Sequence, residues 1–194
     1  SISEAGVLSF VAAPDFETKS AYAVTVSIGD GTNTTAQALT VSVTDVNEAP
    51  LITSEAALSA AENQTAIGVI TASDAEGATV TFTLGGDDAS SFSISEAGVL
   101  SFVASPDFET KSTYAVTVSV GDGTSTTDQA LSISETDVNE SPVITSIATF
   151  SAAENQTAIG VITASDAEGA TVTFTLGGDD ASSFSISEAG GLSF

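Results

Sequence analysis

The sequence contains no cysteine, histidine, methionine or tryptophan, and these absences exclude several kinds of chemistry. Without cysteine there is no disulfide framework. Without histidine and cysteine, the usual zinc and copper sites lack their nitrogen and sulfur donors. The Ser–His and Cys–His nucleophiles of many hydrolases are excluded for the same reason. Any metal site in this chain must therefore be built from oxygen ligands.

Positive charge is also scarce, because Lys19 and Lys111 are the only basic residues against 26 acidic ones. The net charge of −24 repels nucleic acid and anionic membrane surfaces and predicts an affinity for cations. No run of about 18 apolar residues is present, so we expect no membrane insertion of this segment. With 42% apolar residues and ten phenylalanines, the chain can nevertheless bury a core, unlike an acidic disordered tail.

The most informative feature of the sequence is an internal repeat. The motif DVNE begins at Asp45 and again at Asp137, so the repeat is 137 − 45 = 92 residues long. Identity or close similarity holds over two pairs of segments: residues 59–98 are identical to 151–190, and residues 1–50 match 93–142 with few changes. The chain is therefore a tandem array.

Short strands with an alternating pattern fill each repeat. In YAVTVSV, the apolar residues Tyr114, Val116, Val118 and Val120 occupy every second position, as a strand buried on one face requires. Clusters of Gly, Asp, Asn, Ser and Pro separate such runs and indicate about seven strands per repeat. No segment has a helical apolar period, so we expect no long helix. The predicted fold class is all-β, with tandem seven-stranded Greek-key β-sandwiches.

Two prolines mark the predicted boundaries between repeats. Pro50 and Pro142 each follow a DVNE motif. Because proline cannot donate to a central strand ladder, each marks the start of an edge strand just after a junction. We therefore expect the C-terminal part of one repeat at residues 1–50, a complete repeat at residues 51–142 and the N-terminal part of the next at residues 143–194.

The acidic residues cluster in the predicted loops rather than in the strands. They occur in the short motifs AEN, SDAEG, PDFE, GDG and DVNE. Carboxylate and amide oxygens suit a hard cation, and calcium takes about 6–8 of them, whereas magnesium retains its waters and fits less well. The alternative interpretation is that these are solvated turn residues, the usual role of aspartate in loops. The concentration of acids at the turns favours calcium.

The order of these motifs resembles the cadherin repeat, and the resemblance covers the whole chain. AEN is followed by SDAEG, then by PDFE and YAVTVSVGDG, and finally by DVNE. The composition, without cysteine and rich in Thr, Ser, Ala and Gly, is more similar to bacterial cadherin-like tandem repeats of large secreted, RTX-type surface adhesins than to animal cadherins. The sequence departs from the usual motifs at Glu48, Ala49, Ala61 and Glu76, and the RTX nonapeptide is absent.

The resemblance implies that loops of neighbouring repeats share calcium at each junction, with about two or three ions per junction given 6–8 oxygens per ion. At the first junction it implies the ligands Asp15, Glu17, Asn47, Glu48, Asp74, Glu76 and Asp122. At the second junction it implies Glu62, Asp107, Glu109, Asn139, Glu140, Asp166 and Glu168. Asp45 and Asp137, which begin the DVNE motifs, are weaker candidates.

One acidic pair lies outside these motifs. Asp87 and Asp88 follow two glycines, and we favour a turn there over an additional calcium site. Adjacent turn carboxylates do not present the separation of about 5–9.5 Å that glycoside hydrolysis uses. No nucleophile accompanies them, so we expect no enzymatic activity.

Two non-enzymatic functions remain open from the sequence. Near-identical copies favour a calcium-rigidified spacer, an extender of a bacterial cell-surface adhesin, because repetition supplies length whereas specificity requires difference. The alternative is a cadherin-like binding module that mediates cell–cell or carbohydrate adhesion directly. The expected partners are neighbouring repeats of the same chain and, through the incomplete terminal segments, other copies arranged head to tail.

Overall fold

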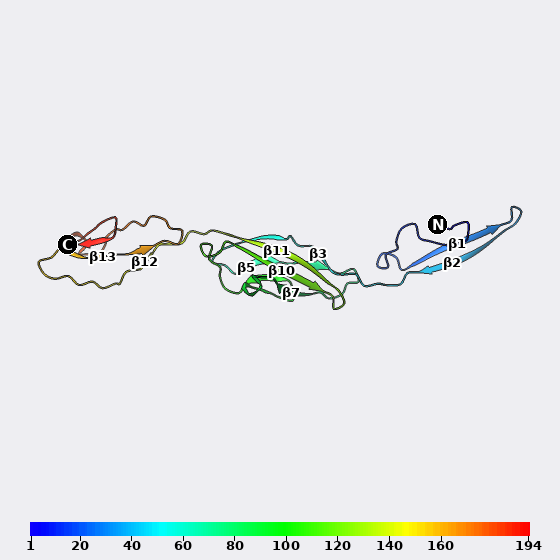
Figure 1. Ribbon diagram of the computed structural model, residues 1–194, viewed down its shortest axis with the longest axis horizontal. Helices are drawn as coiled ribbons and strands as arrows, with labels where there is room; N and C mark the ends of the chain where they lie inside the picture. Colours follow the sequence, from blue (N-terminus) through cyan, green and yellow to red (C-terminus); the bar gives the residue numbers. More distant parts are fainter. The chain divides into compact units, whose positions relative to one another are not determined.

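The computed structural model describes residues 1–194 and consists of β-strands joined by turns and loops (Figure 1). It contains sixteen strands, β1 to β16, and two short 3₁₀ helices, η1 (Ala89–Ser91) and η2 (Ala181–Ser183). Neither helix is long and apolar enough to cross a membrane. The predicted all-β fold and the absence of long helices are confirmed.

The chain divides into two compact units, each assembled from separate stretches of sequence. The first unit contains Ser1–Leu58, Ala66–Val103 and Tyr114–Ile133, and the second contains Ser59–Thr65, Ala104–Thr113 and Ser134–Phe194. Each unit combines residues from more than one predicted repeat. The repeat boundaries at Pro50 and Pro142 therefore stay predictions.

A regular hairpin lies in the first unit. Its strands, β1 (Ala21–Gly29) and β2 (Thr34–Ser42), pair antiparallel along their whole length. In the turn, Gly31 has a φ of +90°, and Asp30 Oδ1 accepts backbone hydrogen bonds of 2.8 and 2.7 Å from the residues two and three positions later. Glycine supplies the left-handed conformation and aspartate closes the turn, so the chain reverses here.

The central part of the chain forms a β-sandwich. One sheet has the order β4 (Ala57–Ala61), β11 (Thr126–Thr136), β10 (Thr113–Gly121) and β7 (Thr81–Gly85). The other has the order β5 (Ala66–Val69), β9 (Val99–Phe102) and β8 (Phe92–Ile94). A short pair joins β3 (Leu51–Ile52) to β6 (Ala72–Ser73). The early strand β4 lies beside the late strand β11, which is the crossing expected of the predicted Greek key.

Alternating apolar residues of β10 and β11 form the centre of this sandwich. Val116, Val118 and Val120 of β10 are 2%, 0% and 0% exposed, and Leu131 and Ile133 of β11 are equally buried. Complete burial of such a side chain stabilises the fold by roughly 1.5–3 kcal/mol relative to exposure. The sequence-based prediction that the three valines share a buried face is confirmed.

Three aromatic rings pack together in the same core. The ring centroid of Phe92 lies 4.8 Å from that of Phe102 and 5.6 Å from that of Tyr114. The rings of Phe102 and Tyr114 are 5.2 Å apart, and both phenylalanines meet Tyr114 edge to face at 68° and 84°. This is the geometry that aromatic pairs favour, so the cluster adds specificity to the apolar core.

The turn at Asp87 and Asp88 forms as the sequence predicted. Gly86 has a φ of +93°, and Asp88 precedes helix η1. The carboxylate of Asp88 accepts a 2.8 Å hydrogen bond from the N–H of Ala115 on β10. This contact fixes the turn against the neighbouring strand, which supports a structural role for Asp88.

Strands of the second unit reproduce part of the preceding repeat. β12 (Val143–Ile144) pairs with β14 (Ala164–Ser165), as β3 does with β6. A three-stranded sheet has the order β13 (Ala158–Val161), β16 (Gly191–Ser193) and β15 (Ser185–Ile186), as β5, β9 and β8 do. The same sequence therefore gives the same local pairings 92 residues later.

Candidate metal sites

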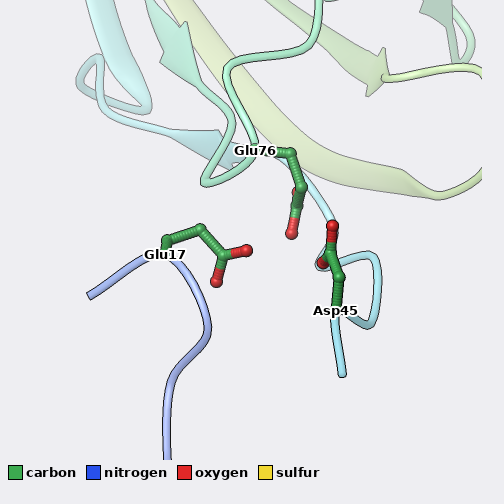
Figure 2. A group of neighbouring side chains, drawn as sticks. All are labelled: Glu17, Asp45 and Glu76. Carbon is green, nitrogen blue, oxygen red and sulfur yellow. The ribbon is translucent and has the colours of Figure 1, made fainter. Parts of the chain in front are cut away.

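Three loops of the first unit bring carboxylates together, as Figure 2 shows. Glu17 lies in the turn that precedes β1, Asp45 follows β2, and Glu76 lies in the turn after β6. One oxygen from each side chain lies within 4.8 Å of the other two. Oxygens at this separation can coordinate one hard cation between them.

The negative charges around Glu17 affect its pKa. A hydrogen bond from its own backbone N–H lowers the pKa of Glu17, but desolvation and the charges of Asp45 and Glu76 outweigh this effect and raise it. A raised carboxylate pKa means that the ionised form is disfavoured where it stands. A bound cation would reverse this penalty.

A second carboxylate of the same region pairs with Glu76. The backbone N–H of Glu48 donates to Glu76 Oε1 at 3.3 Å. A hydrogen bond between the two side chains, with desolvation and the charge of Glu76, raises the pKa of Glu48 to about 7, and the same hydrogen bond lowers the pKa of Glu76. The ionised form of Glu48 is therefore disfavoured beside Glu76, and a cation bound between the two carboxylates would relieve this.

Asn47 links the DVNE segment to a turn of the following repeat. Its Nδ2 donates to Asp122 Oδ2 at 2.9 Å, to Ser125 Oγ at 3.2 Å and to the carbonyl of Glu48 at 2.8 Å. Asp122 Oδ1 accepts backbone hydrogen bonds of 2.6 Å from Thr124 and Ser125. The bond from the Ser125 backbone, followed by those from Asn47 and Thr124, lowers the pKa of Asp122, so this carboxylate stays ionised.

The second unit contains two carboxylate groups that share Glu109. Their members, again with oxygens within 4.8 Å of one another, are Glu62, Glu109 and Glu140 in one group and Glu109, Asp137 and Glu168 in the other. Desolvation raises the pKa of Glu109 against a hydrogen bond from its own backbone, and the charges of Glu62, Asp137 and Glu168 raise it further. Because Glu109 belongs to both groups, a cation bound in either group would relieve this repulsion.

Glu62 is buried, with 2% of its surface exposed, and it ties together three parts of this region. Its Oε1 accepts a 2.6 Å hydrogen bond from the N–H of Val138, and its Oε2 accepts a 3.0 Å bond from the N–H of Phe108. The next residue, Asn63, donates its side-chain amide to Glu140 and its backbone N–H to the carbonyl of Pro106. The end of β4, the PDFE turn and the DVNE segment are thus held against one another.

The Glu140–Glu168 pair repeats the arrangement of Glu48 and Glu76. The N–H of Glu140 donates to Glu168 Oε1 at 3.0 Å. This backbone bond and a side-chain hydrogen bond between the two lower the pKa of Glu168 to about 2, and the same side-chain bond raises the pKa of Glu140. The pairing is therefore a property of the repeat.

Four carboxylate oxygens of these regions are buried without a hydrogen-bond partner. They are Asp74 Oδ2, Glu76 Oε2, Glu140 Oε2 and Glu168 Oε2. Buried polar atoms are normally satisfied, because leaving them unpaired is costly. Carboxylate oxygens that no N–H satisfies are the ligands a hard cation requires, so the residues present fit calcium.

Several predicted ligands are engaged in their own turns. Asp15 accepts hydrogen bonds of 3.0 and 2.8 Å from the backbone and hydroxyl of Thr18, and Asp107 accepts equivalent bonds of 3.1 and 3.0 Å from Thr110. The bonds from Thr18, backbone first, lower the pKa of Asp15. These aspartates lie outside the three close groups and match the turn role that the sequence left as an alternative.

The remaining predicted ligands lie at the edges of the groups. Asp74 Oδ1 accepts a 3.0 Å bond from the N–H of Ala78, and Asp166 Oδ1 accepts the same bond from Ala170. Asn139 donates its side-chain amide to the carbonyl of Glu140 at 2.8 Å. Each of these side chains still has an oxygen that is not used by these bonds.

Asp45 and Asp137 were the weaker candidates from sequence, yet each belongs to one of the close groups. Each precedes the Val-Asn-Glu of its linker by one residue, in a segment without regular secondary structure. Strand periodicity says nothing about such positions. The available signal was the recurrence of the aspartate at the same place in both repeats.

Comparison with known proteins agrees with the fold. Residues 47–133, a little under half of the chain, match the family model described as Bacterial Ig domain. No curated protein matches the chain. Solved structures with the same fold come from cadherins and protocadherins.

One is human Protocadherin-24 EC1-2, which is 19% identical with a TM-score of 0.55, over 76% of this chain and 77% of that one. Mouse Cadherin-23 EC22-24 is 22% identical with a TM-score of 0.53, over 93% of this chain and 65% of that one. The Protocadherin GammaB4 extracellular domain is 22% identical with a TM-score of 0.57, over 94% of this chain and 32% of that one. This chain therefore spans only part of each.

These similarities concern the fold of the chain. Residues 47–133 are similar to the family described as Bacterial Ig domain, and the fold is similar to that of cadherin repeats. The fold is the cadherin/Ig-like β-sandwich predicted from the sequence, and domains of this class are typically non-catalytic. The acidic groups of the chain are compatible with ion binding.

Proposed function

We propose that this chain is a calcium-rigidified extender segment of a bacterial cell-surface adhesin and that it has no catalytic activity. The observation that supports this most directly is the group formed by Glu17, Asp45 and Glu76. Glu17 precedes the linker, Asp45 belongs to it, and Glu76 follows it in the next repeat. A cation bound there would join consecutive repeats through the linker.

Calcium fits this donor set better than other ions. Every ligand is an oxygen, and carboxylates outnumber amides, as calcium prefers at about 6–8 coordination. The proposed ligands, in both junctions, are Asp15, Glu17, Asn47, Glu48, Asp74, Glu76 and Asp122, then Glu62, Asp107, Glu109, Asn139, Glu140, Asp166 and Glu168. We add Asp45 and Asp137 to the proposed set, because each belongs to one of the close carboxylate groups.

The mechanism follows from the electrostatics of the two groups of loops. Without a cation, the clustered carboxylates repel one another, as the raised pKa values of Glu17, Glu48, Glu109 and Glu140 indicate. With calcium, the same oxygens become ligands of a common ion, so the repulsion is replaced by bridging bonds. Calcium therefore converts a flexible linker into a stiff one.

A spacer explains the near-identity of the repeats better than a binding module does. Residues 59–98 and 151–190 do not differ at any position, and no tryptophan is present to anchor a partner. Length and stiffness come from repetition, whereas recognition requires a distinctive surface. The second candidate, direct cell–cell or carbohydrate adhesion, would require a ligand on a glycan array or in a pull-down.

The location we propose is the bacterial cell surface, outside the cell. Extracellular modules can use weak calcium sites, with dissociation constants of about 0.1–1 mM, because calcium is abundant there. The match to the Bacterial Ig domain supports a surface protein. The similarity of composition to repeats of large secreted, RTX-type adhesins supports the extender role within such a protein.

Calorimetric titration with calcium, combined with small-angle scattering at each point, tests this function. We expect binding at two or more sites and a rise in stiffness of the chain as the sites fill. Magnesium at the same concentrations is the control and should give weaker binding and less stiffening. Absence of calcium binding, or binding with no change in scattering, would contradict the proposal.

A further inference from the structure

The chain enters and leaves the central sandwich through two segments without regular secondary structure, residues 43–50 and 137–142 (Figure 1). After the short strand β3, the incoming segment leads into β4, and the outgoing segment follows directly from β11. These two strands are neighbours in one sheet. A pull on both segments therefore draws β4 toward its N-terminal end and β11 toward its C-terminal end.

Hydrogen bonds show that β4 and β11 run parallel to each other. The carbonyl of Ala56, just before β4, accepts a 2.9 Å bond from the N–H of Ser132. Further along the chain, the N–H of Glu62 donates to the carbonyl of Thr136 at 3.2 Å. The bonded residues thus advance in the same direction on both strands, as they do in a parallel pair and not in an antiparallel one.

In a parallel pair, the two opposite pulls act along the strands and not across them. The strands have to slide past each other, so all the hydrogen bonds between them are loaded at the same time. The antiparallel β1–β2 hairpin behaves differently, because its ends, Ala21 and Ser42, lie opposite each other. A pull on these ends opens the hairpin one residue pair at a time.

Side chains extend the row of bonds at both ends of the parallel pair. Gln129 Nε2 donates to the carbonyl of Ser54 at 3.4 Å, ahead of the first backbone bond described above. At the other end, Glu62 Oε1 accepts a 2.6 Å bond from the N–H of Val138, which already belongs to the outgoing segment. Glu62 is only 2% exposed, so water does not compete for this bond.

We propose that the parallel pair formed by residues 54–62 and 129–138 is the part of the central sandwich that bears tension, and that Gln129 and Glu62 hold its two ends. Under a pull along the chain, β3 separates from β6 first, because these strands pair over only two residues each. The parallel pair then carries the load until its bonds break together. The load itself rests on the proposed extender function, whereas the resistance is a property of the fold.

Pulling the same protein in two directions tests the proposal. The chain contains no cysteine, so two introduced cysteines define the points of attachment. Ala49→Cys with Ser141→Cys applies the load along the strands, and Glu55→Cys with Asp128→Cys applies it across one end of the parallel pair. All four residues are exposed. Both double variants are made in the full chain, and the rupture force is measured by atomic force microscopy in chelator.

The gain in length identifies the unfolding event in each variant. The attachment points enclose 141 − 49 = 92 residues in the first variant and 128 − 55 = 73 residues in the second. At about 3.3–3.6 Å per residue, complete unfolding of these segments releases at most about 30–33 nm and about 24–26 nm. The rest of the chain carries no load.

We expect a rupture force at least about twofold higher along the strands than across them, because sliding loads all the bonds at once and peeling loads them singly. Equal forces, or a higher force across the pair, would overturn the proposal. Urea denaturation without load checks that the two variants are equally stable. Should the second variant be less stable, cysteines at the exposed Ala57 and Ala130 replace those at Glu55 and Asp128.

Repeating the measurement in calcium separates the parallel pair from the proposed metal sites. The hydrogen bonds need no ion, so the difference between the two directions should already be present in chelator. A difference that appears only in calcium would overturn the proposal, since coordination would then bear the load. A difference in chelator, without calcium binding by calorimetry, would retain the parallel pair and overturn the proposed function.

Side-chain variants combined with the lengthwise attachment test the two ends. In chelator, Glu62→Gln should lower the rupture force by roughly a quarter, because an amide accepts fewer N–H bonds than a carboxylate does. Its control is Glu154→Gln, at the exposed repeat equivalent outside the loaded segment. Gln129→Ala should act similarly, with Gln37→Ala as its control.

The force across the pair distinguishes a holding role for Glu62 from a general effect on the fold. That load is applied at the end near Ser54, so Glu62→Gln should leave the force across the pair unchanged. An equal loss in both directions would show that Glu62 only stabilises the sandwich. If neither Glu62→Gln nor Gln129→Ala changed the lengthwise force, their role in holding the ends would be overturned.

Discussion

Residues 59–98 and 151–190 have identical sequences but different structures. In the first copy, β4 (Ala57–Ala61) and β7 (Thr81–Gly85) form strands at the two edges of a four-stranded sheet. In the second copy the corresponding residues, 149–153 and 173–177, form no strand. Residues 173–177 are identical to residues 81–85, so the local sequence does not by itself determine that this segment becomes a strand.

The difference follows from where each strand finds its partner. β13, β15 and β16 pair with one another, and their equivalents β5, β8 and β9 do so in the first copy, all within 40 residues of sequence or little more. β4 and β7 instead require β11 and β10, which follow later in the chain. A segment with strand propensity forms a strand when it has both a partner strand to hydrogen-bond with and an apolar surface to pack against.

The largest expected effect is on the free energy of unfolding, when an aspartate replaces an apolar residue at equivalent positions of two repeats. Val120→Asp puts a carboxylate at a site that is 0% exposed, and we expect a loss of about 3–5 kcal/mol in the free energy of unfolding. Ile28→Asp changes the equivalent position, which is 69% exposed, and should cost less than about 0.5 kcal/mol. Urea denaturation followed by circular dichroism measures both.

Both variants are compared with the unmodified chain at the same protein concentration. Equal losses for the two variants would mean that the hairpin face is covered within one chain. Equal and negligible losses would mean that the central core is not packed as described.

Calcium should stabilise both groups of loops by mass action. An ion that binds only the folded state at about 100 times its dissociation constant adds about 2.7 kcal/mol per independent site. We therefore expect a rise in melting temperature in calcium and a fall in chelator, measured by scanning calorimetry. Identical melting curves under the two conditions would remove the basis for the proposed metal sites.

The fold was predictable because its signals are local. The alternation of Val116, Val118 and Val120 and the glycine-containing turns specify strands without knowledge of their partners. The loss of strand at residues 173–177 was not predictable from that sequence, because TFTLG has the same pattern at residues 81–85, where it is β7. What differs is a neighbour distant in sequence.

The candidate site was predictable in kind but not in detail. Clustering of acids in loops identified Glu17, Glu76, Glu62 and Glu109, all of which lie in the close groups. It could not separate them from Asp15, whose carboxylate bonds Thr18 in its own turn. Nor could it rank Asp45, because a carboxylate in an irregular segment is placed by tertiary contacts rather than by local pattern.

The two units also differ in how many groups depend on one glutamate. Glu109 belongs to two carboxylate groups, whereas its repeat equivalent Glu17 belongs to one. Glu109→Gln should therefore weaken calcium binding more than Glu17→Gln does, by about tenfold if one further ligand bond is lost at about 1.4 kcal/mol.

Asp128→Asn is the control for this measurement, because Asp128 corresponds to Ala36 in the other copy and lies outside the groups. Calorimetric titration of the three variants should give the order Glu109→Gln, Glu17→Gln, Asp128→Asn in decreasing effect. If Asp128→Asn weakened binding as much as Glu109→Gln, net charge rather than coordination would control the affinity.

The smallest expected effect is a pH dependence. Between about pH 4.5 and 7, stability in chelator should fall, whereas calcium affinity should rise. The pKa of Glu48 is raised from 4.5 to about 7 by its hydrogen bond with Glu76, by desolvation and by the charge of Glu76. The folded chain therefore binds more protons than the unfolded chain between these values, so in chelator its stability should fall as pH rises from about 4.5 to about 7. Calcium competes with the same proton, so calcium affinity should rise over that window.

Thermal melts in chelator measure the effect on stability, with Glu48→Gln as the control that lacks the titrating group. Calorimetric titrations with calcium at pH 5.5 and 7.5 measure the effect on calcium affinity. A wild-type chain whose stability in chelator rose through this window would show that the carboxylates with lowered pKa, such as Asp122 and Glu168, dominate instead.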